Sequence, residues 1–268
     1  MGLKSRWRLP KSLFQGPRYR VSGGFISEEV DEEKISFRMQ VYQMFPQKIV
    51  LDLFAGKGYL SWLYATYGCE KLICVEKNSE YFKVLKQNLA KFDGKVEFFN
   101  MDNLEWLENC LEKIRGPITY VDFDAFGCPT PQIKKFFEKY PINHALTISV
   151  TDGLIYNFRR ISNLDLAEYY LQDFYLDPKS IGKPKSIQNL GEYCIQIQKQ
   201  FMDILCMRFD AQAFPLYFKI NSRNTAIYSS YLILPKIVGV ADFKRYVGLR
   251  VVKYGKALSK QRSFKCAW

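Results

Sequence analysis

The sequence predicts an α/β fold with a mostly parallel, seven-stranded sheet, helices on both faces and an antiparallel hairpin at its C-terminal end. From Lys48 onward, short apolar runs alternate with amphipathic segments. Alternation repeated this often is typical of a parallel sheet whose crossovers are helices. Near the C-terminus, two β-rich runs surround the turn sequence Asn221-Ser222-Arg223-Asn224, which predicts the hairpin.

The elements follow from the chain in order. A first helix is expected over Ser27–Met44, because acidic residues suit its positive N-terminal end and Pro46 breaks it. Buried strands are expected at Ile49–Phe54, Leu72–Glu76, Val96–Asn100, Ile118–Phe123 and Ala145–Val150. The helices between them are expected at Tyr59–Tyr67, Glu80–Phe92, Leu104–Ile114 and Gln132–Tyr140.

The last third of the chain is less regular at first. Tyr156–Gln188 contains prolines, a glycine and lysines, and we interpret it as an insertion that faces the substrate. A helix is expected at about Glu192–Met207, and the hairpin strands at Ala213–Ile220 and Ala226–Leu234.

Composition limits the class of protein. The 268 residues are 48% hydrophobic, which is enough for one large domain with small additions. We expect a basic arm at 1–26, the α/β domain at 27–240 and a basic tail at 241–268. No apolar run of about 18 residues predicts a membrane span, and no secretory signal is evident. Seven cysteines without a C-x-x-C pair, and a single histidine, indicate a cytoplasmic protein with reduced thiols and no metal site.

Positive charge gathers at both ends of the chain. The net charge is +12, and the first 27 residues and the stretch from Phe243 onward contain no acidic residue. Aromatic residues such as Trp7 and Tyr254 lie among these charges and can stack on unpaired bases. We therefore expect a nucleic-acid partner, although basic ends can also serve solubility alone. In the arm, the expected contacts are Arg6, Arg8, Arg18 and Arg20.

The first predicted strand leads into a glycine turn. Asp52 ends its apolar run, and Phe54, Gly56 and Gly58 follow. Ser61 stands where a dinucleotide-binding loop would have its third glycine, and Asp52 would repel a phosphate. A carboxylate beside a glycine turn suits a cationic or hydroxyl-bearing ligand, and S-adenosylmethionine offers both. This loop is therefore predicted to bind that cofactor.

The next two strands also end in polar residues. Glu76 ends the second strand and can accept both hydroxyls of a ribose, whereas its alternative role is a solvated surface position. Asp102 and Asn103 follow the third strand, where an adenine amino group can be recognised; Asp102 can instead cap the next helix. All three are predicted cofactor contacts.

The fourth strand ends in a second distinctive motif, Tyr120 to Pro129. Alternation places Asp122 and Asp124 on the same side of the strand, and buried carboxylates are costly unless they are used. We assign Asp122 to the cofactor. Asp124 can accept a hydrogen bond from an amine and Phe126 can stack on a base, with Gly127 and Pro129 forming the turn. After the fifth strand, Thr151 and Asp152 are expected to close the pocket, although Asp152 can also cap a helix.

These motifs resemble the class I S-adenosylmethionine-dependent methyltransferases. Asp124-Ala-Phe-Gly-Cys-Pro129 is similar to the Asp-Pro-Phe-Gly-Ser-Pro motif of the tRNA guanine-N2 dimethyltransferase family, and Val150-Thr-Asp152 to its Thr-x-Thr-Asp stretch. The resemblance covers roughly residues 30–160 and departs from the motif at Ala125 and Cys128. It implies a Rossmann-like methyltransferase fold and a guanine amino group as the methyl acceptor.

The function predicted from these residues is N-methylation of an exocyclic base amine, with RNA favoured over DNA. Asp124 and Phe126 are the predicted catalytic residues. A DNA amino-methyltransferase, a protein or small-molecule methyltransferase and a non-catalytic RNA-binding module remain alternatives. A Cys128 thiol that attacks a pyrimidine ring is a minor one, because no neighbouring base is evident.

Overall fold

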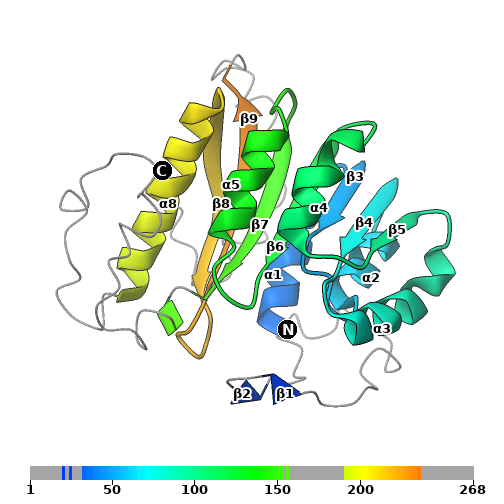
Figure 1. Ribbon diagram of the computed structural model, residues 1–268. Coiled ribbons are helices and arrows are strands. Elements are labelled where there is room, and N and C mark those ends of the chain that lie inside the picture. The colour runs from blue at the N-terminus through cyan, green and yellow to red at the C-terminus, as the bar shows by residue number, and fades with distance from the viewer. Residues whose placement is uncertain (1–19, 22–23, 26–31, 154, 157–189, 237–268) are drawn as a thin grey trace.

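The computed structural model describes residues 20–21, 24–25, 32–153, 155–156 and 190–236 (Figure 1). The expected basic tail, nearly all of the expected insertion and most of the basic arm lie outside the described residues. Within the arm, β1 (Arg20–Val21) and β2 (Gly24–Phe25) form a short antiparallel pair. The expected boundaries of the arm and of the tail both fall outside the described part, so they remain predictions.

A seven-stranded sheet forms the centre of the described structure, in the order β5-β4-β3-β6-β7-β9-β8. Its strands are β3 (Ile49–Asp52), β4 (Lys71–Val75), β5 (Val96–Phe99), β6 (Ile118–Asp124), β7 (Leu146–Asp152), β8 (Ala211–Ile220) and β9 (Ile227–Pro235). The first five strands are parallel, and β9 pairs antiparallel with both β7 and β8. The predicted fold class and hairpin are therefore confirmed.

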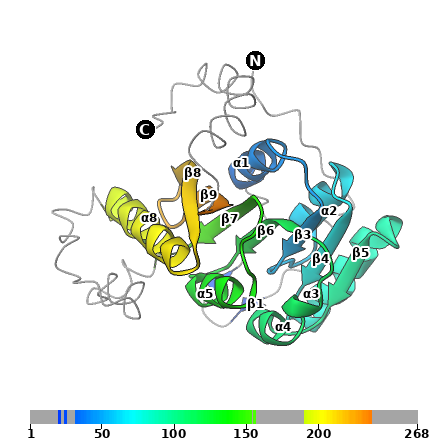
Figure 2. The same cartoon turned by 90° about the horizontal axis from the view of Figure 1, so that it is seen from above.

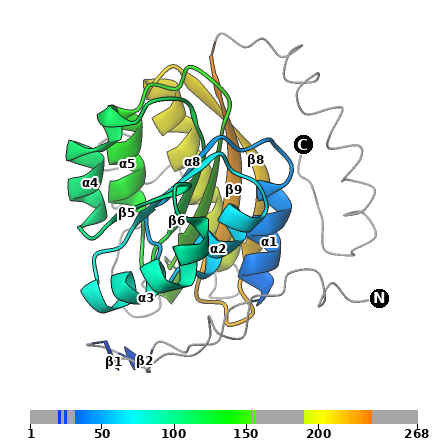
Figure 3. The same ribbon diagram turned by 90° about the vertical axis from the view of Figure 1, so that its right-hand side faces the viewer.

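Helices cover both faces of this sheet (Figure 2). One layer contains α1 (Glu32–Tyr42), α2 (Tyr59–Thr66) and α3 (Ser79–Leu89). The other contains α4 (Asn103–Asn109), α5 (Thr130–Lys139) and α8 (Leu190–Arg208). Figure 3 shows α1 on the side of the sheet opposite α4 and α5. The face beneath α1 is the one that matters for the site, because Asp122 and Asp124 point to it.

The strand order reverses between β3 and β6, which pair in parallel through Asp52 and Asp122. From β3 the chain continues outward to β4 and β5, whereas β6 continues the sheet in the other direction. In open α/β sheets, ligands bind outside the carboxyl ends of the strands at such a reversal. The polar residues at the ends of β3, β4, β6 and β7 therefore lie where this topology places a ligand.

Several element boundaries differ from those expected. The predicted helix Leu104–Ile114 divides into α4 and a 3₁₀ turn at Leu111–Lys113, and the end of the predicted helix Glu80–Phe92 is a 3₁₀ turn at Ala90–Phe92. β7 extends to Asp152, because its pairing with β9 continues to that residue. Thr151 and Asp152 consequently belong to the strand that we expected to end at Val150.

Candidate functional site

The turn after β3 requires its glycines for two different reasons. Gly56 and Gly58 have φ angles of 53° and 87°, in the left-handed region that glycine adopts without steric cost. A Cβ at Gly58 would also lie 2.7 Å from Leu85 Cδ1, so a side chain there would push α3 away. A Cβ at Gly56 would have the Phe54 carbonyl oxygen, at 3.9 Å, as its nearest contact. The backbone of the turn is thus accessible to a ligand at Gly56, whereas at Gly58 it packs against α3.

Asp52 lies beneath this turn and is almost completely buried. Its Oδ2 accepts a hydrogen bond of 2.6 Å from the Ser61 hydroxyl, and its Oδ1 accepts one of 3.4 Å from the Phe54 backbone N–H. Burial, reinforced by the neighbouring Asp122, raises the pKa of Asp52 to about 8. Burial and the nearby Asp122 thus favour the neutral form of the Asp52 carboxyl, whereas a cation beside it would favour the ionised form. Phe54 itself is half-buried and packs against the core.

Glu76 joins the end of β4 to the glycine turn. One carboxylate oxygen accepts from the Gly56 N–H at 2.8 Å and the other from the Asn78 N–H at 2.6 Å. Burial raises the pKa of Glu76, although these N–H groups oppose the shift. Each oxygen still has a second lone pair. The side chain therefore holds the turn in place and retains acceptor capacity at its exposed edge.

Asp102 caps α4, which is the alternative that the sequence left open. Its Oδ1 accepts from the Leu104 N–H at 2.9 Å, and Lys77 Nζ lies 3.0 Å from its Oδ2. Burial would raise its pKa, but the hydrogen bonds from Lys77 and from the Leu104 and Glu105 N–H groups, together with the Lys77 charge, hold the pKa below its ordinary value. Asn103 begins α4; its Oδ1 accepts from Gln132 and its Nδ2 donates to the Leu53 carbonyl. Both residues thus lie at the carboxyl end of the parallel strands.

Asp122 has a different environment from the one that we expected. It is fully buried, and Arg38 Nε donates to both of its oxygens at 3.0 Å. The Tyr64 hydroxyl donates to its Oδ2 at 2.5 Å. Burial raises the pKa of Asp122, and the Arg38 charge opposes this shift. With these partners and no solvent exposure, Asp122 anchors α1 and α2 to the sheet, and the structure does not support our expectation that it contacts the cofactor.

Asp124 lies one pleat further along β6, on the same face and closer to solvent. Its Oδ2 accepts from Lys34 Nζ at 2.8 Å, and its Oδ1 lies 3.6 Å from Arg38 Nη2. Arg38 Nη2 also donates to the Thr151 hydroxyl at 2.9 Å. Burial would raise the pKa of Asp124, but the Lys34 and Arg38 charges lower it to about 2. Asp124 is therefore an ionised hydrogen-bond acceptor at neutral pH.

The turn after Asp124 exposes an aromatic ring. Phe126 is 86% exposed, whereas Pro129 is buried at the start of α5. The carbonyl of Gly127 accepts from the Gly153 N–H at 2.8 Å, and this bond joins the turn to the end of β7. Phe126 is thus held two residues from Asp124 with its ring open to solvent.

Asp152 lies on the opposite face from Asp124. Thr151 shares the face of Asp124, and successive residues of a strand point to opposite faces. Asp152 is buried and accepts from Gln198 of α8 at 3.2 Å. The structure therefore brings together Asp52, Asp122, Asp124 and Thr151 on the α1 face and places Asp152 away from them.

Sequence reasoning missed the two cations that organise this site. Arg38 is fully buried on α1, beside Ile35 and Tyr42, which pack under the same helix. A signal was available: Lys34 and Arg38 are spaced i, i+4, and Arg38 falls inside an apolar stripe. Tyr64 and Ser149, which extend the network through Tyr120, were missed as well because they read as ordinary core positions.

The remaining expectations concern the arginines of the basic arm, a metal site and a membrane span. Arg6, Arg8 and Arg18 lie outside the described residues, and Arg20 lies in β1. Among the described residues, no cluster of three or more metal-ligating side chains occurs. Nor does any helix in the described ranges combine the length and apolar character needed to span a membrane.

Comparisons with known proteins place this geometry in a fold family. Residues 33–123 match the family described as Conserved hypothetical protein 95. The structure of Trm1 from Pyrococcus horikoshii, solved with S-adenosyl-L-methionine, has a TM-score of 0.53 at 11% identity, over 82% of this chain and 58% of that chain. The chain has the class I methyltransferase fold. The resemblance expected from the sequence is confirmed at this level.

One curated relative also matches part of this methyltransferase fold. The tRNA(Phe) (4-demethylwyosine(37)-C(7)) aminocarboxypropyltransferase of Pyrococcus horikoshii is 40% identical over 72 residues. The match covers 26% of this chain and 26% of that protein, so it spans about a quarter of the relative's length.

Proposed function

We propose that the protein is an S-adenosylmethionine-dependent N-methyltransferase that acts on an exocyclic amine of a nucleic-acid base, with guanine N2 in a tRNA-like RNA as the favoured acceptor. The observation that carries this proposal is the pairing of Asp124 with Phe126 at the end of β6. Asp124 is an ionised acceptor, and Phe126 is an open aromatic surface two residues away. An amine donor on a flat ring suits both groups.

The residues at the ends of β3, β4 and β5 fit the cofactor. The open backbone at Gly56 permits close approach, Glu76 retains lone pairs for ribose hydroxyls, and Asp52 can ionise toward a cationic group. When bound, S-adenosylmethionine supplies a methyl group on a positively charged sulfur. Trm1 from Pyrococcus horikoshii, which shares this fold, was solved with that cofactor, and this supports the same assignment here.

The chemistry of Asp124 follows from the amine. The lone pair of an aromatic amine is delocalised into the ring, so the nitrogen is a weak nucleophile. A carboxylate that accepts one of its N–H groups increases electron density on nitrogen and fixes its direction, while stacking on Phe126 fixes the plane of the base. Holding the acceptor in line can contribute several kcal/mol to the rate. A base inside a helix would first have to be extruded.

A second candidate activity uses the same cofactor. The curated relative is an aminocarboxypropyltransferase, and its 72 matched residues are 40% identical to this chain. Transfer of the aminocarboxypropyl group in place of methyl would use the same adenosine contacts. Incubation with cofactor labelled separately in each group, and with RNA or DNA pools, distinguishes the two activities: we expect the methyl label in RNA. No label in either pool would leave a non-catalytic binding module.

Glu76 provides a test of the cofactor site. We expect Glu76→Ala to weaken S-adenosylmethionine binding by about 1–3 kcal/mol, because charge-assisted hydrogen bonds to the ribose are lost. Calorimetry measures this directly. Glu80→Ala is the matched control, since Glu80 lies nearby on α3 and pairs with Lys83 in solvent. Equal affinities for wild type and Glu76→Ala would remove Glu76 from the cofactor site.

The basic ends provide a test of the polyanionic partner. Lys4–Arg20 and Lys244–Lys265 contain fourteen lysines and arginines and no acidic residue. RNA affinity should fall with salt at a log–log slope of about −0.7 for each phosphate neutralised on a single strand. Deletion of residues 1–20 should make this slope shallower in a filter-binding titration. If both proteins give the same slope, the arm does not contact the nucleic acid.

A further inference from the structure

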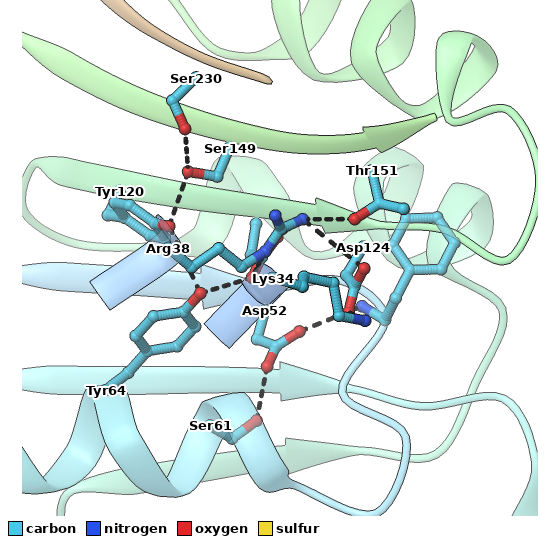
Figure 4. A network of polar contacts seen from close by, with 12 residues as sticks. Lys34, Arg38, Asp52, Ser61, Tyr64, Tyr120, Asp124, Ser149, Thr151 and Ser230 are labelled. Atoms are coloured by element: carbon cyan, nitrogen blue, oxygen red, sulfur yellow. Dashed lines mark hydrogen bonds and ion pairs between the residues drawn. The ribbon is translucent and has the colours of Figure 1, made fainter. Parts of the chain in front are cut away.

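The first helix brings a cation to each oxygen of the acceptor carboxylate. Lys34 and Arg38 lie one turn apart on α1 and project from one face of it. Lys34 Nζ is 2.8 Å from Asp124 Oδ2, and Arg38 Nη2 is 3.6 Å from Asp124 Oδ1. Figure 4 shows the Lys34 and Arg38 side chains close to Asp124. Lys34 makes the closer of the two contacts.

The two cations differ in their other contacts. Arg38 is fully buried and also bonds to Asp122 and Thr151. Lys34 is 25% exposed and Asp124 14%, so this pair lies at the border between the core and solvent. A substrate that approaches Asp124 from solvent therefore meets Lys34 before it meets Arg38.

We propose that Lys34 is a positioning residue for methyl transfer, which holds the Asp124 carboxylate ionised and in one orientation so that its remaining lone pairs face the substrate amine. This proposal rests on the acceptor role of Asp124 proposed above. An ionised carboxylate has about four acceptor positions, so Lys34, Arg38 and the Thr151 hydroxyl together still leave one for the amine. Lys34 acts through Asp124 and is not itself assigned a contact with the reacting atoms.

A comparison with Asp52 indicates how the two cations affect the pKa of Asp124. Asp52 receives hydrogen bonds from the neutral Ser61 hydroxyl and Phe54 N–H, and its pKa is about 8. Asp124 faces two cations, and its pKa is about 2. Burial raises the pKa of both groups, so charge is the main difference between them. The groups that face Asp124 are Lys34 and Arg38 of α1, Asp122 of β6 and Thr151 of β7.

The test is a substitution that removes the charge and keeps most of the length, Lys34→Met. An opposite charge this close lowers a carboxyl pKa by about 1–3 units, so the variant should raise the pKa of Asp124 by that amount. Carbon-13 NMR titration of the aspartate carboxyls, with Asp124→Asn to assign the signal, measures this without any activity. The low-pH limb of kcat/KM should move upward by the same amount, because protonated Asp124 no longer accepts the amine.

Two further variants make the result specific. Lys34→Arg should restore the wild-type titration and pH profile, and Lys83→Met removes a lysine from an exposed ion pair as the control. An unchanged Asp124 titration in Lys34→Met would overturn the proposal, and so would an equal loss of activity at every pH. If wild type transfers no group but the Asp124 titration shifts as expected, the proposed function fails while the electrostatic role of Lys34 stands.

Discussion

Arg38→Met is expected to lower the free energy of unfolding by about 3–5 kcal/mol, because Asp122 would remain buried without its cation. Arg38 and Asp122 are both fully buried, and three hydrogen-bond and ion-pair contacts of 2.9–3.0 Å join them. The loss would also release α1 from Thr151. Urea denaturation followed by circular dichroism measures the change. A decrease below about 1 kcal/mol would show that the pair contributes little.

The double variant Arg38→Met, Asp122→Asn separates lost charge pairing from lost packing. Arg38 Nη1 is buried without a hydrogen-bond partner among the described residues, so the pair itself carries a cost. Removing both charges should therefore recover about half of the stability lost in the single variant. If the double variant is as unstable as Arg38→Met, the loss comes from packing and not from the unpaired carboxylate.

Asp124→Ala is expected to reduce methyl transfer by about 10²–10³-fold, the range found when one positioned hydrogen-bonding group is removed from an active site. Cofactor affinity should change by no more than a few-fold, because Asp124 faces α1, whereas the cofactor contacts that we propose are at Glu76 and the glycine turn. Single-turnover transfer and calorimetry give the two values. Asp93→Ala, at an exposed turn where Asp93 bonds to the Gly94 N–H, is the control. A variant that keeps most of its activity would make Asp124 a structural residue.

The sheet could be predicted because its signal is local. Apolar runs bounded by turns marked five parallel strands and the hairpin, and strand alternation placed Asp122 and Asp124 on one face, as the shared contact with Arg38 confirms. The end of β7 could not be predicted, because its last two residues are held by pairing with β9, which lies some 75 residues later in the chain. In the extended strand, Asp152 points toward α8 and not toward the pocket that we expected it to close.

The partners of the carboxylates could not be predicted from the sequence, because they come from elements that only the tertiary structure brings together. The sequence of β6 alone does not indicate that Arg38 pairs with Asp122, because Arg38 lies 84 residues away on α1. The rotation of α1 against the sheet decides which of its residues point inward, and packing sets this rotation. Asp102 and Asn103 lie at the end of the sheet, as expected, but only the contact with the Leu104 N–H shows that Asp102 caps α4.

Mass spectrometry of nucleosides shows whether the protein transfers a methyl group to a base amine. RNA and DNA pools would be incubated with S-adenosylmethionine and the full chain, then digested, with Asp124→Ala as the inactive comparison. We expect a new guanosine in the RNA digest, heavier by one methyl group or two on N2 and absent with the variant. A product that carries an aminocarboxypropyl group, or methylation on ring carbon, would contradict it, as would the absence of any modified nucleoside.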